Sequence, residues 1–395
     1  MKKNIFILGS TGSIGNSTLN VIRNHKNKFD IKLLTTNNNI IKVYNQAIEF
    51  NVKNLVIQNK NKYFKHEKKF KQRNIKVYFN FNEALKSINK KVYYTINAIS
   101  GLEGLEPTIN VIKYTHNIAI ANKESIICGW KFIEKELKKN KTNFIPIDSE
   151  HFSIWSLIKN ENKENIKKIY LTASGGPFLN KHLSELKNIK PKFALKHPNW
   201  KMGKKISIDS ATLMNKIFEL IEAKNIFKLN VNIFKIIIHP KSYIHAIVQF
   251  KSGLIKFLAH DTNMEIPIMN SLFLKNEILN YNYKDINFEK LNGLNFIDPD
   301  IKKFQSLKIL KLINNKNSYF ETILITINDE LVDYYLKGKI GYLSVTKILL
   351  KLIKKRNFIK YYRYGPKNIN DIKIMVGKVK TYLNIYLNNN EKNFK

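Results

Sequence analysis

Residues 9–15 read Gly-Ser-Thr-Gly-Ser-Ile-Gly and stand between an apolar run, Asn4–Leu8, and a helical pattern, Ile14–Ile22. Glycines at these three positions let the backbone turn sharply, approach a pyrophosphate and pack a helix closely on a strand. The first N–H groups of such a helix can bind the anion. The spacing G-x-x-G-x-x-G is a variant of the commoner dinucleotide fingerprint. Its strand–turn–helix context favours a phosphate-binding turn over a glycine-rich turn that binds nothing.

Apolar and amphipathic segments alternate from this turn through the first half of the chain. Alternation of this kind predicts a parallel, Rossmann-type sheet with helices on both faces. Further strands are expected at Ile31–Leu34, Asn54–Ile57, Val77–Phe79, Val92–Ile99, Asn117–Ala121 and Phe144–Ile147, and helices at Ile40–Phe50, Pro107–Tyr114 and Glu124–Leu137.

The pattern changes near Ser149, where strands follow one another through short turns. Such strands indicate an α/β domain whose sheet contains antiparallel pairs. Strands are expected at Ile169–Thr172, Phe234–Ile238, Tyr243–Phe250 and Leu254–Ala259, with helices at Glu150–Ile158 and Ala211–Ala223. Residues 275–304 are rich in Asn and Lys and suit a linker, and residues 305–395 read as several helices. We therefore expect an α/β protein divided into 1–148, 149–274, 275–304 and 305–395.

The chain is strongly basic: among 395 residues, 68 are Lys or Arg and 30 are Asp or Glu, which gives a net charge of +38. These charges are spread along the sequence together with many Asn, Ile, Phe and Tyr residues, a set that A/T-rich codons explain. The charge favours phosphorylated, anionic substrates. One cysteine, Cys128, excludes an intramolecular disulfide and a cysteine-rich zinc site. Without an apolar run of membrane-spanning length, we expect a soluble cytoplasmic protein.

The segment after the second expected strand bears on the choice of cofactor. Sites for NAD usually place an acid on the ribose about 20 residues after the glycines. Here the sequence reads Thr-Thr-Asn-Asn-Asn over residues 35–39, without an acid. A 2′-phosphate could lie there without repulsion, which favours NADP.

Carboxylates and hydroxyls gather in two further segments, Pro146–Glu150 and Ser207–Glu219. An oxygen-only set of ligands would suit Mg²⁺ or Mn²⁺. From spacing alone, Asp148 and Glu150 could equally be a helix N-cap and a first-turn acid. Thr172–Phe178 is a second glycine-containing turn that could hold a phosphate or be a simple turn. The loop His197–Gly203 is typical of a mobile lid or of a surface loop that buries Trp200.

Together, these segments closely resemble the 1-deoxy-D-xylulose 5-phosphate reductoisomerase family. The resemblance covers essentially the whole chain, is weakest over the last ninety or so residues, and follows the family's order and intervals. It is carried by ILGSTGSIGNSTL (Ile7–Leu19), ANKES (Ala121–Ser125), PIDSEH (Pro146–His151), TASGGPF (Thr172–Phe178), HPNWKMGKKISIDSATLMNK (His197–Lys216) and IHPKSYIH (Ile238–His245).

The resemblance implies conversion of 1-deoxy-D-xylulose 5-phosphate to 2-C-methyl-D-erythritol 4-phosphate with NADPH and a divalent metal, an early step of the non-mevalonate route to isoprenoids. It implies Mg²⁺ or Mn²⁺, with Co²⁺ an option, and a homodimer formed through the catalytic-domain sheet. Asp148, Glu150 and Glu219 would be the metal ligands. Lys123 would contact substrate hydroxyls and assist proton transfer, and Ser149 would hold the substrate beside the metal.

The remaining site residues implied by the resemblance fall into three groups. Ser174, His197, Ser210, Asn215 and Lys216 would form the substrate-phosphate pocket. Trp200 and Met202 would belong to the lid. Positions matching cofactor contacts are Thr11, Gly12, Ser13, Ile14, Asn37, Asn38, Asn39, Asn122, Glu124 and Gly203.

One departure from the family pattern concerns the 2′-phosphate. The loop after the second strand usually reads like Gly-Lys-Asn, whereas here it is Asn37-Asn38-Asn39, without the glycine and the positive charge. We hypothesise that Lys42, which is near in sequence, compensates. Replacing Lys42 with alanine should then raise the Michaelis constant for NADPH, and an unchanged constant would remove Lys42 from the argument.

Two other functions compete with the reductoisomerase. The charge of +38 would suit a polyanion- or nucleic-acid-binding protein on a Rossmann scaffold, which predicts a steep dependence of affinity on salt. The glycine-rich turn alone would suit an NADP-dependent dehydrogenase that acts without rearrangement. Neither needs the full set of carboxylates and hydroxyls, so we expect a small sugar phosphate as the partner, with no specific nucleic acid and no membrane.

Overall fold

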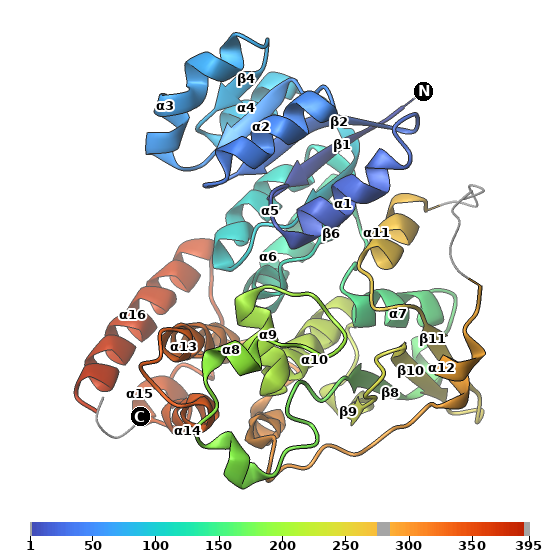
Figure 1. Cartoon of the computed structure of the whole chain (residues 1–395), viewed down its shortest axis with the longest axis vertical. Helices are drawn as coiled ribbons and strands as arrows, with labels where there is room; N and C mark the ends of the chain where they lie inside the picture. The colour runs from blue at the N-terminus through green and yellow to red at the C-terminus, as the bar shows by residue number, and fades with distance from the viewer. Residues whose placement is uncertain (1, 275–284, 391–395) are drawn as a thin grey trace. The chain divides into compact units, whose positions relative to one another are not determined.

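A computed structural model describes residues 2–274 and 285–390, which form two compact units (Figure 1). Unit 1 holds the residues up to Phe152 and a segment that begins at Met264, whereas unit 2 begins at Ser153 and resumes in the C-terminal part. The boundary falls within helix α7 (Ser149–Ile158). The four-part division expected from the sequence stays a prediction. Of its linker, residues 275–284 lie outside the described residues, and residues 285–304 include α12 (Phe288–Asn292).

Unit 1 is built on a parallel sheet with the order β4-β3-β2-β1-β5-β6-β7. Its central strand β1 carries the apolar run Ile5–Leu8, all of which is buried. A strand covered on both faces needs such a continuous run, and the predicted Rossmann-type sheet is confirmed. The strands are β1 (Lys3–Leu8), β2 (Phe29–Thr36), β3 (Asn54–Ile57), β4 (Lys76–Tyr78), β5 (Val92–Asn97), β6 (Thr115–Ile120) and β7 (Asn143–Phe144).

Helices follow the strands of this sheet, and one arrives from far along the sequence. They are α1 (Ser13–Arg23), α2 (Ile40–Glu49), α3 (Lys60–Lys71), α4 (Phe81–Ile88), α5 (Leu105–Ile112), α6 (Lys123–Asn140) and α11 (Glu265–Leu272). Figure 1 shows α11 beside α1, where Asn20 donates a hydrogen bond of 3.0 Å to Glu265. Just after α11, Phe273 makes edge-to-face contacts with His25 and Phe29. The segment after Met264 thus completes the α1 side of unit 1.

Unit 2 contains a mixed sheet in the order β11-β10-β8-β9. β10 is antiparallel to both β8 and β11, whereas β8 and β9 are parallel. The strands are β8 (Ile166–Ala173), β9 (Phe234–Ile238), β10 (Ile244–Phe250) and β11 (Ile255–Ala259). The predicted α/β domain with a mixed sheet is therefore confirmed.

Helices make up most of the rest of unit 2. They are α8 (Pro191–Ala194), α9 (Lys204–Ala211), α10 (Met214–Phe227), α12, α13 (Tyr319–Leu336), α14 (Tyr342–Leu352), α15 (Arg356–Ile359) and α16 (Ile369–Asn388). α13 packs against α9, α14 and α16. A buried ion pair of 3.2 Å between Lys224 and Glu321 joins α10 to α13. The predicted helical character of the C-terminal part is confirmed.

Two expected elements differ from the structure. The helix predicted at Ala211–Ala223 is wrong at its start, because α9 ends at Ala211 and α10 begins at Met214. Leu213 between them has a φ of 57°, in the left-handed region that interrupts a helix. The strand predicted at Phe144–Ile147 is only Asn143–Phe144, since Pro146 has no N–H to donate to a neighbouring strand.

Among the described residues, none of the helices combines the length and the apolarity needed to cross a bilayer.

Candidate active site

The glycine-rich turn of unit 1 has the geometry of a phosphate cradle. Gly9 has a φ of 75°, and a Cβ there would lie 2.6 Å from the carbonyl oxygen of Ala98. A Cβ on Gly15 would lie 2.5 Å from the carbonyl oxygen of Gly9, so only glycine allows α1 to pack so closely. Gly12 is the N-cap of α1 and offers no side-chain acceptor to its first N–H groups. These N–H groups are available to an anion.

The side chains beside the cradle hold its shape. Asn16 donates from its amide to the carbonyl oxygen of Thr11 at 3.1 Å, and the hydroxyls of Thr11 and Thr36 are 3.1 Å apart. The second contact ties the cradle to the end of β2. The structure therefore brings four of the predicted cofactor residues, Thr11, Gly12, Ser13 and Ile14, to the same turn, with Thr36 as a neighbour that the sequence did not single out.

The asparagine loop after β2 is exposed at all three positions, Asn37, Asn38 and Asn39. Asn39 is the N-cap of α2 and accepts a hydrogen bond from the backbone N–H of Lys42. The neighbouring β3 ends beside this loop, because the backbone N–H of Gln58 donates to the carbonyl oxygen of Thr36 at 3.0 Å. The loop thus lies at the same edge of the sheet as the cradle, between the carboxyl ends of β1 and β3.

Asn122 caps α6 and orders the third predicted cofactor segment. Its Oδ1 accepts from the N–H of Ser125 at 2.6 Å, and its amide donates to the carbonyl oxygens of Ile99 and Gly101. Lys123 and Glu124 in the first turn of α6 are buried. Gly203, the remaining predicted cofactor residue, belongs to unit 2, where it is the exposed N-cap of α9.

Asp148 combines a helix cap with an ion pair. One of its oxygens lies 3.2 Å from the N–H of Glu150 and 3.3 Å from Nδ1 of His151, and the other lies 3.5 Å from Nζ of Lys123. Ser149 donates from its hydroxyl to the buried Glu150 carboxylate at 2.6 Å. The interpretation of Asp148 as a helix N-cap is therefore correct. Only one of its oxygens takes part in the cap, so the other is available for a second contact. His151, which the sequence did not single out, reaches Asp148 because the two are three residues apart on a helical turn.

In unit 2, Glu219 is a fully buried carboxylate with polar neighbours on its own helix. Nζ of Lys216 lies 2.5 Å from one carboxylate oxygen, and the amide of Asn215 donates to the other. All three side chains are buried. Residues three and four apart share a helix face, so starting α10 at Met214 places Asn215, Lys216 and Glu219 together. An ionised carboxylate in such surroundings needs these charge-assisted bonds.

His197 joins two serine hydroxyls from different segments. Its Nε2 lies 2.9 Å from Oγ of Ser174, after β8, and 3.1 Å from Oγ of Ser210, on α9. Its Nδ1 accepts from the backbone N–H groups of Asn199 and Trp200, at 3.1 and 2.9 Å. Since Nδ1 is an acceptor, the neutral ring carries its proton on Nε2. Burial, and then the positive charge of Lys216, lowers the pKa of His197 to about 4.

The loop after His197 is fixed by contacts within unit 2. The amide of Asn199 donates to the carbonyl oxygen of Pro240 at 2.6 Å and to Oγ of Ser242 at 2.9 Å. Trp200 is half-buried with its ring edge-on to His245, and Met202 is half-buried too. His245 in turn stacks on His260 at a centroid distance of 3.7 Å. Trp200 is partly covered but does not lie in the core, and the interpretation of this loop as a lid stays a prediction.

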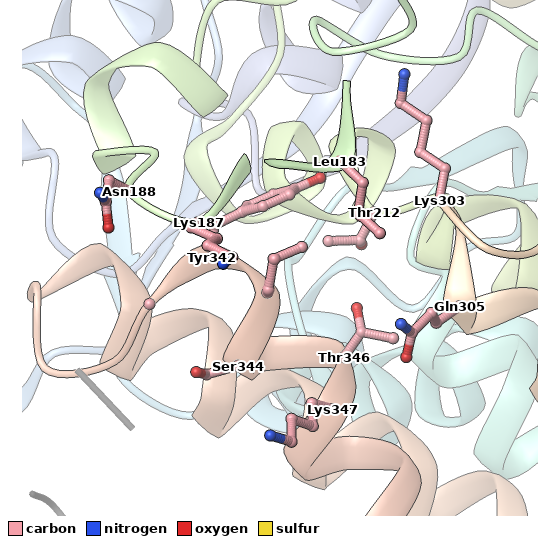
Figure 2. A pocket seen from close by; sticks show the side chains of 12 residues that line it. Leu183, Lys187, Asn188, Thr212, Lys303, Gln305, Tyr342, Ser344, Thr346 and Lys347 are labelled. Carbon is pink, nitrogen blue, oxygen red and sulfur yellow. The ribbon is translucent and has the colours of Figure 1, made fainter. Parts of the chain in front are cut away.

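A separate cavity of about 420 Å³ lies in unit 2 between the start of α14 and the segment Leu183–Asn188 (Figure 2). Lys187, Lys303 and Lys347 line it together with Tyr342. None of the predicted site residues is among its lining, so this cavity is distinct from the His197 cluster.

Comparison with known proteins covers nearly the whole chain. Three family models match: 1-deoxy-D-xylulose 5-phosphate reductoisomerase over residues 5–129, its C-terminal domain over 144–227, and the DXP reductoisomerase C-terminal domain over 260–381. The 1-deoxy-D-xylulose 5-phosphate reductoisomerase of Pelagibacter ubique is 50% identical over 372 residues, which cover 94% of this chain and 96% of the relative. The chain belongs to the 1-deoxy-D-xylulose 5-phosphate reductoisomerase family.

Other members of the reductoisomerase family agree in sequence and in structure. The enzyme of Wolbachia pipientis from Culex pipiens is 39% identical, with 91% of each chain covered. A solved reductoisomerase from Zymomonas mobilis in complex with NADPH matches with a TM-score of 0.85 and 29% identity, covering 96% of this chain and 98% of that one. Another, in complex with NADPH, fosmidomycin and magnesium, matches with a TM-score of 0.87 and 31% identity, covering 96% and 97%. The family predicted from the sequence motifs is confirmed.

Proposed function

We propose that this protein catalyses the NADPH- and divalent-metal-dependent conversion of 1-deoxy-D-xylulose 5-phosphate to 2-C-methyl-D-erythritol 4-phosphate, in the non-mevalonate route to isoprenoids. The observation that carries the proposal is the cluster of Ser174, His197 and Ser210, which lies within the residues that the family's C-terminal domain model matches. A polyanion-binding protein would not require this cluster. A dehydrogenase without rearrangement is disfavoured because the family to which the chain belongs is one of reductoisomerases.

The cluster is suited to the phosphate group of the substrate. Two hydroxyls and the Nε2–H of His197 offer neutral donors, and Lys216 supplies the positive charge that also lowers the pKa of His197. Asn215 adds an amide donor on the same helix. A phosphate held there would supply binding energy that positions the reacting end of the sugar.

Asp148, Glu150 and Glu219 are proposed as the ligands of the divalent ion, Mg²⁺, Mn²⁺ or Co²⁺. The donor set fits such an ion because all three supply carboxylate oxygens. One oxygen of Asp148 caps α7 and the other faces Lys123, while Ser149 supports Glu150. The ion would stabilise negative charge on substrate oxygens during the rearrangement. Ser149 is proposed to hold the substrate beside these carboxylates.

Lys123 is proposed to contact the substrate hydroxyls and assist proton transfer. It lies in the first turn of α6, directly after the Asn122 cap, and its ammonium is 3.5 Å from Asp148. This ion pair fixes the position of the Lys123 ammonium, and therefore the place where Lys123 could donate or accept a proton. The loop with Trp200 and Met202 is proposed to exclude water while the chemistry takes place.

The cradle at the start of α1 fits a dinucleotide diphosphate because its N–H groups lack a side-chain cap and a Cβ would collide at Gly9 and Gly15. Thr11, Gly12, Ser13, Ile14, Asn37, Asn38, Asn39, Asn122, Glu124 and Gly203 are proposed to contact NADPH. The nicotinamide would supply the hydride that reduces the rearranged carbonyl.

The direct test combines the purified protein with 1-deoxy-D-xylulose 5-phosphate, NADPH and one of Mg²⁺, Mn²⁺ and Co²⁺. We expect a loss of NADPH absorbance that requires both the sugar phosphate and the metal, with the branched polyol phosphate as product. Chelation of the metal should stop the reaction, and adding the metal back should restore it. Folded protein that binds NADPH but shows no turnover with any of the three metals would contradict the proposed reaction.

A homodimer formed through the unit 2 sheet is part of the proposal. β11 is an edge strand, and Ile255 and Phe257, which share one face of it, are 60% and 50% exposed. Apolar side chains exposed on a sheet edge favour pairing with another chain.

We expect Phe257→Glu to shift the protein from dimer to monomer in sedimentation velocity. Phe193→Glu, at an exposed phenylalanine of α8, is the control and should leave the dimer intact; a monomeric wild type would contradict this part.

A cytoplasmic location is also proposed, on the strength of the single cysteine, Cys128, which is buried and suits a reducing compartment. Fractionation of cells that express the protein tests it, and recovery with the membrane fraction would contradict it.

A further inference from the structure

The ammonium group of Lys62 reaches the asparagine loop from a neighbouring βα unit. Lys62 lies in the first turn of α3, after β3, and its Nζ donates a hydrogen bond of 2.6 Å to the carbonyl oxygen of Asn38. Its side chain is half-buried, whereas Asn37, Asn38 and Asn39 are exposed. A positive charge therefore stands at the loop even though the loop sequence contains none.

A second contact fixes both partners. Asn59, the N-cap of α3, donates from its amide to Oδ1 of Asn38 at 2.8 Å, and its own Oδ1 accepts from the backbone N–H of Lys62 at 3.1 Å. One side chain thus holds the loop and sets the first turn of α3. The Asn59 cap places Lys62 at the start of α3 and also holds Asn38. The contact between Lys62 and Asn38 therefore follows from how the helix begins.

The loop occupies the place where a Rossmann-type site distinguishes its two cofactors. The segment after the second strand lies beside the ribose 2′ position, with an acid in sites for NAD and a cation in sites for NADP. Residues 35–39 contain neither. The Thr11–Thr36 contact joins this loop to the diphosphate cradle, so a dinucleotide held by the cradle would bring its adenosine ribose toward the loop.

We propose that Lys62 is a specificity-determining residue that binds the 2′-phosphate of NADPH, supplying from α3 the positive charge that the asparagine loop lacks. The inference rests on the proposed function. Lysine binds phosphate as a point charge through three rotatable donors, so Lys62 can keep one donor on Asn38 and direct another to the ligand. The asparagine amides would add neutral donors around the same phosphate.

Lys42 was the expected source of this charge, and its placement differs from that of Lys62. Lys42 lies on α2, where its backbone N–H donates to Asn39. Within residues 2–274 and 285–390, its side chain makes no hydrogen bond or ion pair with the loop. The contact from Lys62 to Asn38 makes Lys62 the stronger candidate, and the two lysines can be separated by experiment.

The test measures nucleotide binding directly, without substrate or metal. Wild type, Lys62→Gln and Lys42→Gln are titrated with NADPH and with NADH, following nicotinamide fluorescence. Lys65→Gln, at an exposed lysine further along α3, is the matched control for loss of one charge. We expect Lys62→Gln to raise the Kd of NADPH about tenfold, the scale of one charge-assisted hydrogen bond near the surface, and to change the Kd of NADH less than twofold. Lys42→Gln and Lys65→Gln should change both values less than twofold.

Adenosine 2′,5′-bisphosphate and adenosine 5′-monophosphate, used as competitors, extend the test to the phosphate alone. Lys62→Gln should weaken the bisphosphate about tenfold and the monophosphate little, and Lys62→Arg should restore most of the difference. An unchanged Kd of NADPH in Lys62→Gln, or equal weakening of NADPH and NADH, would overturn the role of Lys62 while leaving the proposed reaction standing. Wild type that binds neither dinucleotide would overturn the proposed function, and this inference with it.

Discussion

Glu219→Gln is expected to reduce kcat by about 1000-fold or more and to lower the free energy of unfolding at the same time. The loss of rate follows because Glu219 is a proposed ligand of the metal ion. Such an ion contributes several kcal/mol to charge stabilisation, and each 1.36 kcal/mol is a factor of ten in rate. The loss of stability follows because the ammonium of Lys216, itself buried, would lose the carboxylate that lies 2.5 Å away. Removing one partner of a buried pair costs about 3–5 kcal/mol.

The chain offers a matched control for separating these two effects. Lys224 and Glu321 form another buried pair that also involves α10, and Glu321 is not among the proposed site residues. Glu321→Gln should lower stability by a similar amount in urea unfolding but leave the kcat of the folded enzyme within about twofold. Turnover is measured as loss of NADPH absorbance at saturating substrate and metal. Retention of wild-type kcat in Glu219→Gln would contradict the proposal that Glu219 is a metal ligand.

His197→Ala is expected to lower kcat/KM for the sugar phosphate by about 10- to 100-fold. One proposed donor to the substrate phosphate is lost, and hydrogen bonds to charged groups contribute about 1.5–3 kcal/mol. The N–H groups of Asn199 and Trp200 also lose their acceptor, so the loop loses its anchor. The Kd of NADPH, measured without substrate, should stay near that of the wild type. A kcat/KM within twofold of the wild type would show that His197 is not part of the phosphate pocket.

The same residue predicts how stability depends on pH. Burial and Lys216 lower the pKa of His197 from 6.5 to about 4 in the folded protein. Between these values the unfolded chain takes up a proton that the folded chain does not. The free energy of unfolding should therefore decrease as pH falls from 6.5 through 4, and this contribution should be absent above pH 7.

Urea unfolding at pH 7 and pH 5 measures this dependence. His197→Gln, which cannot titrate, should lose less stability than the wild type between the two pH values. His116→Gln, at an exposed histidine of β6, serves as the control and should behave like the wild type. Equal loss of stability in His197→Gln and wild type would show that another group dominates the acid destabilisation.

Some elements that bury an apolar face were predictable from the sequence, whereas helix α3 and the break between α9 and α10 were not. The run Ile5–Leu8 and the following glycines predicted β1, the cradle and α1 within one residue. Helix α3 was missed because only Phe70 of its twelve residues is buried, so its sequence has no apolar periodicity. The break at Leu213 was missed because a left-handed leucine has no local signal.

The site shows the same division. Glu219 follows Lys216 by three residues and Asn215 by four, so helix geometry alone predicts that both side chains can reach its carboxylate. The meeting of Ser174, His197 and Ser210 depends on where a strand end, a loop and a helix lie in the folded unit, and the sequence suggested it only through the family resemblance. The reach of Lys62 to Asn38 had no sequence signal, because it joins two separate βα units of the sheet.

The return of the chain to unit 1 after Met264 has a consequence for its synthesis. A nascent chain that has just passed Phe152 contains every strand of the parallel sheet but not α11. About 120 more residues must be synthesised before α11 can cover its side of α1 and Phe273 can contact His25 and Phe29. At the usual rates of translation this takes roughly 6–24 s. Throughout that interval the N-terminal part must remain on the ribosome with an uncovered apolar surface. A fragment that stops at Phe152 would carry the same exposed surface permanently, so a separately expressed unit 1 would need residues 264–273 attached or supplied in trans.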